Sequence, residues 1–244
     1  MKQKNIRLIL EYDGKNFAGW QYQPNRRTIQ GELEMAIRKL TEEKATLYAA
    51  GRTDAGVHAL GQVANFKTSS NLSPKKYRDA LNFYLPGDIL VRQADEVPIG
   101  FHARYDAIYR SYGYSVSRKR TVANQGRCWE IPVEFDLARL QAGAEHVRGE
   151  HDFSAFCVVS SRKANNRCLV YESRWREEKH ILKYEITADR FIHSMVRSLV
   201  GLMVRLGQAN IDEKQFKQIF RGGDHGAVGR VAPARGLCLI AVGY

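Results

Sequence analysis

The sequence predicts an α+β protein built from two similar halves with mostly antiparallel sheets. Runs rich in branched and aromatic residues, which favour strands, alternate with segments whose apolar residues recur at helical spacing. The order strand, helix, strand, strand occurs once before a connector at residues 98–104 and again, more loosely, after it. With 244 residues, the chain is long enough to bury two small cores. We therefore expect two domains, residues 1–104 and 105–244.

The first half contains four expected strands and two expected helices. The strands are residues 5–12, 46–50, 62–66 and 88–97. Thr28 is a suitable N-cap for the first helix, and apolar residues follow it at helical spacing: Ile29, Leu33, Ala36, Ile37 and Leu40. The second helix begins at Ser73-Pro74, because a proline at the first helical position loses no hydrogen bond.

The second half repeats this order. The expected strands are residues 107–116, 152–159, 169–178, 180–188 and 237–244, and the expected helices are 136–147, 191–207 and a short one after it. The helix over 191–207 is apolar nearly all round, so we expect it to be buried.

The charge balance points to a polyanionic partner. Lysine and arginine number 38 against 26 acidic residues, which gives a net charge of +12. A surface this basic attracts polyanions, of which nucleic acid is the commonest. Net charge alone fits a merely soluble surface equally well.

Compartment and membrane signals are absent from the sequence. The N-terminal segment MKQKNIRLILEYDG lacks the apolar stretch and cleavage site of a secretory leader, and no window reaches 18 apolar residues. The four cysteines form no C-x-x-C pair, which argues against a zinc cluster or a disulfide framework. We expect a cytoplasmic protein with no membrane partner.

Searches for nucleotide and metal motifs fail. A P-loop requires lysine after its last glycine, but Val57 and His58 follow Gly56. The segment GGDHGAVG lacks the spacing of a dinucleotide fingerprint. The histidines are scattered and no H-E-x-x-H occurs, so we expect no metal site.

Asp54 is the strongest candidate for a catalytic residue. It lies in the segment GRTDAGVH between two expected strands, and its neighbours Gly51, Ala55 and Gly56 are too small to shield it. Small residues leave room for a substrate to press against the backbone. A carboxylate there can act as a nucleophile, as a general base or as the cap of a turn, and spacing alone leaves these roles open.

Arg197 is the second candidate, because it falls in the expected buried helix. A guanidinium there needs a carboxylate or phosphate partner, since an unpaired buried charge is very costly. Arg197 either orients a catalytic carboxylate from the other half, forms a structural ion pair, or extends to water at the helix edge.

The strand over 107–116 carries a third signal. Its period of two places Arg110, Tyr112 and Tyr114 on one face. Strands favour tyrosine, so an ordinary sheet face explains them, but the pattern also suits stacking on a nucleobase beside phosphate contacts. Further basic segments, QPNRR, SRKR and SSRKANNR, add positive charge, and the last two resemble flexible loops that could follow an RNA backbone.

Seven segments in order resemble the landmarks of the TruA-type tRNA pseudouridine synthases, from about Ile6 to Tyr244. They are FAGWQYQPNRRTIQGELEMAI, AAGRTDAGVHALGQVANF, LNFYLPGDILV, FHARYDAIYRSYGYSV, HDFSAF, FIHSMVRSLVG and APARGLCLIAVGY. The motif R-T-D-A-G-V-H-A-x-G-Q-V is specific to this family. Arg110 stands where lysine is common in the family, which keeps the charge.

The resemblance implies the pseudouridine synthase fold, in which two ferredoxin- or RRM-like β-α-β-β halves with largely antiparallel sheets join around a central cleft. It implies an isomerase that converts uridine to pseudouridine at positions 38, 39 and 40 in the anticodon stem-loop of tRNAs. Such enzymes use no cofactor and no catalytic metal. Family members are homodimers in which one tRNA contacts both subunits.

The resemblance also assigns roles to residues. Asp54 is implied to be the catalytic aspartate, Tyr112 to stack on the target base, and Arg197 to pair with the aspartate. Arg52 would help to hold the target nucleotide flipped out of the helix, and Leu237 would form an apolar wall of the pocket.

Three other interpretations remain. An RNA-binding module without catalysis would keep all function in an Asp54→Ala variant, since paired β-α-β-β halves also occur in RNA-recognition domains. A nuclease using Asp54 with other acids would require Mg²⁺ and cleave RNA. A basic scaffold with a structural Asp54–Arg197 pair would lose stability as much as activity.

Overall fold

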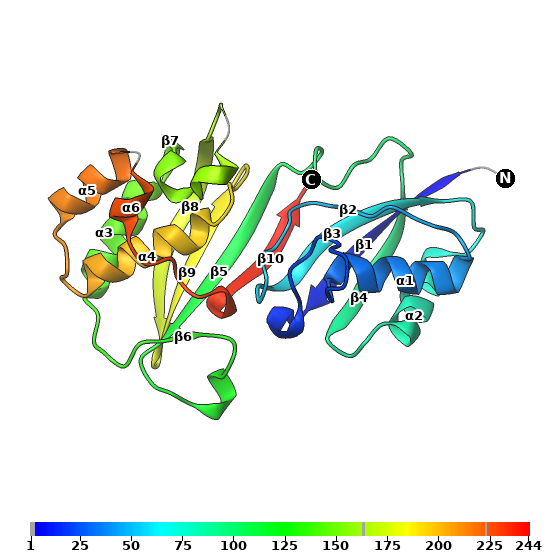
Figure 1. Ribbon diagram of the computed structural model, residues 1–244, viewed down its shortest axis with the longest axis horizontal. Coiled ribbons are helices and arrows are strands. Elements are labelled where there is room, and N and C mark those ends of the chain that lie inside the picture. The colour runs from blue at the N-terminus through cyan, green and yellow to red at the C-terminus, as the bar shows by residue number, and fades with distance from the viewer. Residues whose placement is uncertain (1–2, 163, 223) are drawn as a thin grey trace. The chain divides into compact units, whose positions relative to one another are not determined.

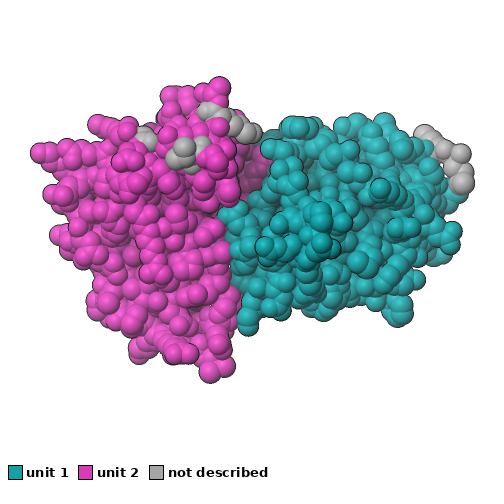
Figure 2. Space-filling model, in the orientation of Figure 1, with its two compact units in different colours: residues 1–108, 238–244 teal, residues 109–237 magenta. Residues whose placement is uncertain are grey.

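The structure, a computed structural model, describes residues 3–162, 164–222 and 224–244 (Figure 1). It divides into two compact units, coloured separately in Figure 2. Unit 1 contains Met1–Ile108 together with Cys238–Tyr244, and unit 2 contains Tyr109–Leu237. The expected domains, residues 1–104 and 105–244, stay a prediction, because compactness alone does not make a domain that folds by itself. The expected boundaries also differ from those of the compact units, because Cys238–Tyr244 belong to unit 1.

Unit 1 contains a sheet with the strand order β4-β1-β3-β10, and β2 pairs with β3. These strands are β1 (Lys4–Tyr12), β2 (Tyr48–Ala49), β3 (His58–Thr68), β4 (Ile89–Val97) and β10 (Leu237–Gly243). β1 is antiparallel to both β3 and β4, whereas β10 runs parallel to β3. The β1–β3 register pairs Ile6 with Phe66 and Leu8 with Ala64, all of them buried, so the centre of this sheet is apolar.

Two helices pack beside this sheet, α1 (Ile29–Thr41) and α2 (Pro74–Tyr84) (Figure 1). Both begin as predicted. The Thr28 side chain accepts a hydrogen bond from the Gly31 N–H at 3.2 Å, and the Ser73 side chain accepts one from the Lys76 N–H at 3.4 Å. The buried face of α1 consists of predicted positions: Ile29, Leu33, Ala36 and Ile37.

The connector after β4 is fixed to the sheet by two buried asparagines. Asn5 Nδ2 donates to the Phe101 carbonyl at 2.8 Å, and Asn65 Nδ2 donates to Asn5 Oδ1 at 2.9 Å. Asn65 Oδ1 accepts from the Ala103 N–H at 2.9 Å, and the Tyr244 hydroxyl donates to the Ala103 carbonyl at 2.7 Å. These hydrogen bonds therefore fix the FHAR segment and the last residue of the chain to unit 1, with Ala103 buried in its core.

Unit 2 contains a sheet with the strand order β5-β9-β8-β7, antiparallel throughout, and a short β6 pairs in parallel with β5. These strands are β5 (Tyr109–Ser117), β6 (Trp129–Glu130), β7 (Gly149–Asp152), β8 (Arg167–Glu178) and β9 (Ile181–Ala188). Burial alternates along β8 and β9, which means that one face of the sheet is covered. In both units the expected α+β class with largely antiparallel sheets is confirmed.

Helices gather on one side of this sheet (Figure 1). They are α3 (Leu137–Val147), α4 (Met195–Gly207), α5 (Glu213–Arg221) and α6 (His225–Val228). α4 is almost entirely buried, as its all-round apolar sequence predicted. Short 3₁₀ helices occupy several connections: η1 (Gly14–Asn16), η2 (Val122–Asn124), η3 (Ser154–Phe156), η4 (Val159–Ser161) and η5 (Ala234–Gly236).

Two sequence predictions in unit 2 were wrong. The strand expected over 152–159 is not formed, because β7 ends at Asp152 and η3 follows. Asp152 Oδ1 accepts hydrogen bonds from the N–H and the hydroxyl of Ser154, which turns the chain at that point. The helix expected from residue 191 begins at Met195, because Ser194 has a φ of +65°, which is outside the helical region.

Candidate active site

The Asp54 loop, residues 50–57, joins β2 to β3 in unit 1. Arg52 and Ala55 are exposed, Asp54 is half-buried, and Thr53 between them is only 6% exposed. Thr53 thus belongs to the buried interior, while Arg52 and Asp54 remain accessible. The structure therefore brings Arg52 and Asp54 together on one accessible loop.

The Thr53 hydroxyl lies in a buried polar network. The Tyr12 hydroxyl is 2.8 Å from Thr53 Oγ1, and Gln62 Nε2 donates to the Tyr12 hydroxyl at 3.4 Å and to the Gly51 carbonyl at 2.8 Å. Tyr12 is 3% exposed and Gln62 is fully buried. Burial raises the pKa of Tyr12 to about 12, so the phenol stays protonated at neutral pH. We call Tyr12, Thr53 and Gln62 the Thr53 triad.

A second segment of unit 1 supports the backbone of the loop. The Trp20 N–H donates to the Thr53 carbonyl at 3.0 Å. Gly19 has a φ of +103°, and a Cβ on it would lie 2.9 Å from the Thr53 oxygen and 3.2 Å from the Ala55 nitrogen. Only glycine allows the two backbones to approach so closely, which explains the FAGW segment in physical terms.

A tight turn follows Asp54. The Val57 N–H donates to the Asp54 carbonyl at 3.2 Å, and Gly56 has a φ of +78°. Glycine at the third position of such a turn adopts a positive φ without strain. The prediction that small residues serve this turn and leave Asp54 accessible agrees with this geometry.

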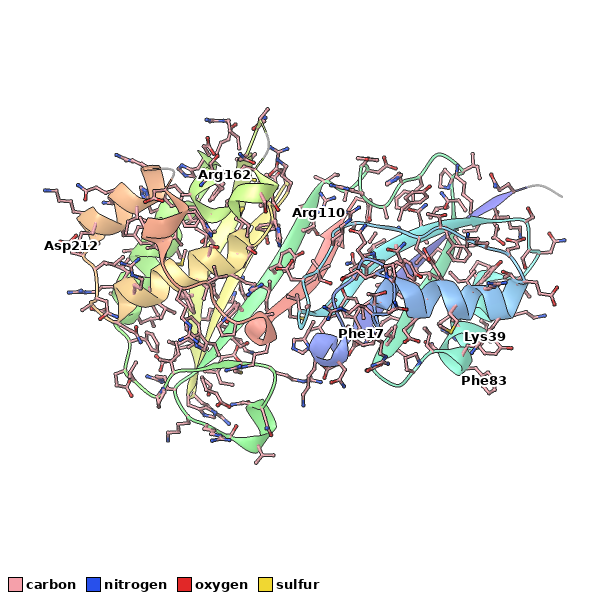
Figure 3. The ribbon with its side chains drawn as sticks, viewed as in Figure 1. Phe17, Lys39, Phe83, Arg110, Arg162 and Asp212 are labelled. Carbon is pink, nitrogen blue, oxygen red and sulfur yellow. The ribbon has the colours of Figure 1, made fainter. Side chains whose placement is uncertain are left out.

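Arg27 anchors the segment that precedes α1. Its Nη1 and Nη2 each lie 2.8 Å from a carboxylate oxygen of Asp88, and its Nε donates to Glu32 at 3.2 Å. The guanidinium also lies 4.2 Å from the centre of the Phe17 ring, which Figure 3 labels. Arg27 belongs to the basic segment QPNRR, but its charge is matched by acids within unit 1.

In unit 2, Tyr112 and Arg110 lie on β5. Tyr112 is buried and its ring meets Phe191 edge-on, with 5.1 Å between ring centres. Arg110, labelled in Figure 3, donates from Nη1 to the Asp189 carbonyl at 2.8 Å. The predicted tyrosine face of this strand is thus packed against the chain that leaves β9.

Arg197 holds the segment that leads to the last strand. Its Nε donates to the Ala232 carbonyl at 2.8 Å, and the Ala232 N–H donates to the Arg197 carbonyl at 3.1 Å. A Cβ on Gly201, one turn further along α4, would collide with the Arg230 carbonyl, so this segment lies directly against the helix. The Ala232 carbonyl serves the Nε of this guanidinium, and the expected carboxylate or phosphate partner stays a prediction.

Tyr114 connects the same segment to β5. Its hydroxyl donates to the Pro233 carbonyl at 2.8 Å, and a Cβ on Gly236 would lie 2.5 Å from its ring. Burial raises the pKa of Tyr114, and the charges of Arg197 and Arg235 oppose that shift. Leu237, which is 7% exposed, follows directly. Tyr114 and Arg197 thus both hold the segment that leads to Leu237, whereas the ring of Tyr112 contacts Phe191.

Sequence reasoning did not identify the Thr53 triad. A glutamine within the apolar run GQVANF was the available signal, because a polar side chain in a buried strand requires a partner. The pairing of Asp54 with Arg197 stays a prediction, since the two residues belong to different units.

The chain was compared with known proteins. Residues 8–106 and 144–244 match the profile of a family described as tRNA pseudouridine synthase. The chain belongs to this family. As a tRNA pseudouridine synthase of the TruA type, it is an enzyme, an isomerase that forms pseudouridine in tRNA.

Curated relatives of this tRNA pseudouridine synthase match over nearly its full length. A protein of Acetivibrio thermocellus named tRNA pseudouridine synthase A is 42% identical over 244 residues, and one of the same name from Caldicellulosiruptor bescii is 39% identical over 243. Each alignment covers 99% of this chain and 100% of the relative. A solved structure described as a Cbf5-Nop10-Gar1 complex matches with a TM-score of 0.35 and 12% identity, over 82% of this chain and 54% of the other, which is too distant to support an argument.

Two of the expected absences concern metal ions and membranes. Within the described residues, no three histidine, cysteine, aspartate or glutamate side chains form a group suited to a metal ion. No helix among them is long and apolar enough to cross a membrane. That this enzyme needs no metal and no cofactor stays a prediction.

Proposed function

We propose that this enzyme converts uridine to pseudouridine at positions 38, 39 and 40 of the tRNA anticodon stem-loop, with Asp54 as the catalytic carboxylate. The observation that carries the proposal is the Asp54 loop. A half-buried carboxylate lies next to an exposed arginine and an exposed alanine, on a backbone that contacts fix on both sides. A rigid, accessible carboxylate of this kind suits reaction with a bulky substrate.

The reaction is an isomerisation in which all atoms of the uridine are retained. The bond between C1′ of the sugar and N1 of the base breaks, the base rotates, and a bond between C1′ and C5 forms. C5 then loses its proton and N1 gains one. Asp54 attacks the sugar, attacks the base or removes the proton from C2′, and each route requires an ionised carboxylate within contact distance of the nucleotide.

The target uridine must leave the stacked stem before it can reach Asp54. Extruding a nucleotide costs a few kcal/mol, which new contacts in the pocket must offset. We assign Arg52 to hold the flipped nucleotide, Tyr112 to stack on its base and Leu237 to form an apolar wall. Arg197 would pair with Asp54. Exclusion of water from such a pocket protects the intermediate from hydrolysis.

We further propose that the enzyme is a cytoplasmic homodimer with an N-terminal domain of residues 1–104 and a C-terminal domain of residues 105–244. In this arrangement one tRNA contacts both subunits. Light scattering of the protein with and without tRNA measures the subunit number directly. A monomer in both samples would contradict the dimer.

The decisive experiment maps pseudouridine chemically in tRNA transcripts that carry uridine at positions 38, 39 or 40. EDTA is present throughout, so that a metal-dependent nuclease would be inactive. The unaltered protein should modify these positions, and Asp54→Asn should bind the same transcripts without modifying them. Asp79→Asn is the matched control, because Asp79 is an exposed carboxylate of α2. It forms an ion pair with its neighbour Arg78, with 2.7 Å between Asp79 Oδ1 and Arg78 Nη2.

Three outcomes would reject the proposal. Binding without modification by the unaltered protein would favour an RNA-binding module. Modification by Asp54→Asn at the normal rate would remove Asp54 from the chemistry. Equal loss of activity in Asp54→Asn and Asp79→Asn would mean that general charge, and not a positioned carboxylate, supports the reaction.

A further inference from the structure

We propose that the Thr53 triad positions Asp54 for the reaction, so that Tyr12 and Gln62 determine the chemical rate although neither is assigned contact with the substrate. This inference rests on the proposed function of Asp54. The triad residues come from β1, from the loop and from β3, and the loop member, Thr53, lies between Arg52 and Asp54 in the sequence.

The contacts fix the loop immediately before Asp54. Gln62 holds the Gly51 carbonyl at 2.8 Å, Tyr12 holds the Thr53 side chain at 2.8 Å, and Trp20 holds the Thr53 carbonyl at 3.0 Å. The turn bond from Val57 then fixes the Asp54 carbonyl at 3.2 Å. The backbone on both sides of Asp54 is therefore set, which limits the positions that its carboxylate can reach.

Burial of these polar groups is not explained by stability alone. Three hydroxyl and amide side chains in an apolar core each lose hydration, and their mutual hydrogen bonds only roughly offset that loss. An apolar trio of similar shape would fill the same space with similar stability. Hydrogen bonds differ from apolar contacts because they are directional. They fix the rotamer of the Thr53 side chain and thereby the backbone position of Asp54, which follows it.

Unit 1 contains a natural control for this pair. Tyr77 and Thr68 form a second buried tyrosine–threonine hydrogen bond of 3.2 Å, at the opposite end of β3 from the Asp54 loop. Tyr77→Phe removes the same atom as Tyr12→Phe, from the same unit and from a comparably buried site. Only Tyr12, however, contacts the loop that carries Asp54.

The experiment compares these two variants by single-turnover kinetics with a tRNA transcript, by tRNA affinity and by thermal unfolding. Tyr12→Phe should lower the rate of pseudouridine formation about 10- to 100-fold at saturating enzyme, because small misplacement of a reacting group is costly. Its tRNA Kd should stay within about threefold of the unaltered value, because the triad is not assigned to RNA contact. Tyr77→Phe should lose a similar amount of thermal stability and keep its rate.

Thr53 provides a second and independent test. Thr53→Ser keeps the hydroxyl and should keep most of the rate, whereas Thr53→Val keeps the shape and should react as slowly as Tyr12→Phe. Combining Tyr12→Phe with Thr53→Val should slow the reaction no more than either change alone, since both break the same contact.

The results separate this inference from the proposed function. If the unaltered protein forms no pseudouridine, the proposed function fails and the positioning role fails with it. If the unaltered protein is active but Tyr12→Phe and Thr53→Val match it in rate, only the positioning role is rejected. A rate loss in Tyr77→Phe equal to that in Tyr12→Phe would also reject it, because the effect would then follow from stability.

Discussion

Arg197 and Ala232 are joined by two hydrogen bonds, from the Arg197 Nε to the Ala232 carbonyl at 2.8 Å and from the Ala232 N–H to the Arg197 carbonyl at 3.1 Å. One side chain of α4 thus fixes the segment that precedes Leu237. A guanidinium can make this contact and still present its two other nitrogens in a planar fork, which a lysine cannot do.

Arg197→Lys should therefore impair catalysis more than binding. We expect the single-turnover rate to fall by about 100-fold or more, while the tRNA Kd changes by less than about fivefold. Arg205→Lys is the matched control, because Arg205 donates to the Ala227 and Val228 carbonyls at 2.8 and 3.0 Å from the same helix. Equal rate losses in the two variants would show that Arg197 acts only by holding the chain.

Gly19→Ala should destabilise unit 1 and slow the reaction. The new Cβ would lie 2.9 Å from the Thr53 oxygen, at a residue whose φ is +103°. Backbone strain at a positive φ costs about 1–3 kcal/mol of stability. The protein can relieve the close contact by shifting the Asp54 loop, which would displace the carboxylate. Gly87→Ala is the control, because a Cβ there would meet no described atom within 4 Å. Urea unfolding and single-turnover rates measure both effects, and identical behaviour of the two variants would contradict the prediction.

The stability of the protein should decrease as the pH falls below about 6.5. Burial lowers the pKa of His146 from 6.5, as do the nearby charges of His151, Arg221 and Lys217. The unfolded chain then binds a proton at His146 at a pH where the folded chain does not, so acid favours unfolding. Its Nε2 also has no hydrogen-bond partner within the described residues.

Urea midpoints between pH 7 and pH 5 measure this effect, with His146→Phe as the variant that cannot titrate. The variant should show a flatter profile over that window. Asp95 and Asp152 do not interfere, because their pKa values are lowered from 3.8 and they titrate in stronger acid. Parallel profiles for the two proteins would exclude His146 as the cause.

Binding of tRNA should weaken steeply with salt. Contacts between phosphates and basic side chains release counterions, so affinity should fall at least about tenfold between about 50 and about 200 mM salt. Arg120, exposed in the predicted basic loop SRKR, is a candidate for one such contact. Arg120→Gln should reduce the slope of log Kd against log salt by about one. A flat dependence for the unaltered protein would argue against a basic RNA-binding surface.

The sequence predicted local features of the fold well, because their causes are local. Thr28 and Ser73 begin helices through hydrogen bonds to residues three positions away, which the sequence alone can reveal. The strand expected over 152–159 failed for an equally local reason, since the turn at Asp152 competes with apolar strand propensity and prevails.

The site was less predictable, because its contacts join distant parts of the chain. The motif pointed to Arg52 and Asp54, which are accessible, but gave no reason to select the buried Thr53 between them. Tyr12 is 41 residues from Thr53 in the sequence, and no spacing rule connects them. The segment held by Arg197 was missed in the same way, since Ala232 lies 35 residues further along. Such pairs become visible only when the chain is folded.

The return of Cys238–Tyr244 to unit 1 has a consequence for how the protein is made. A ribosome releases the chain from its first residue onward, so all of unit 2 is synthesised before β10 can join β3. The hydrogen bonds from the Ile108 N–H to the Gly243 carbonyl and from the Tyr244 hydroxyl to the Ala103 carbonyl can form only after the last residues are synthesised. The part of the enzyme that is synthesised first is therefore the part that is completed last.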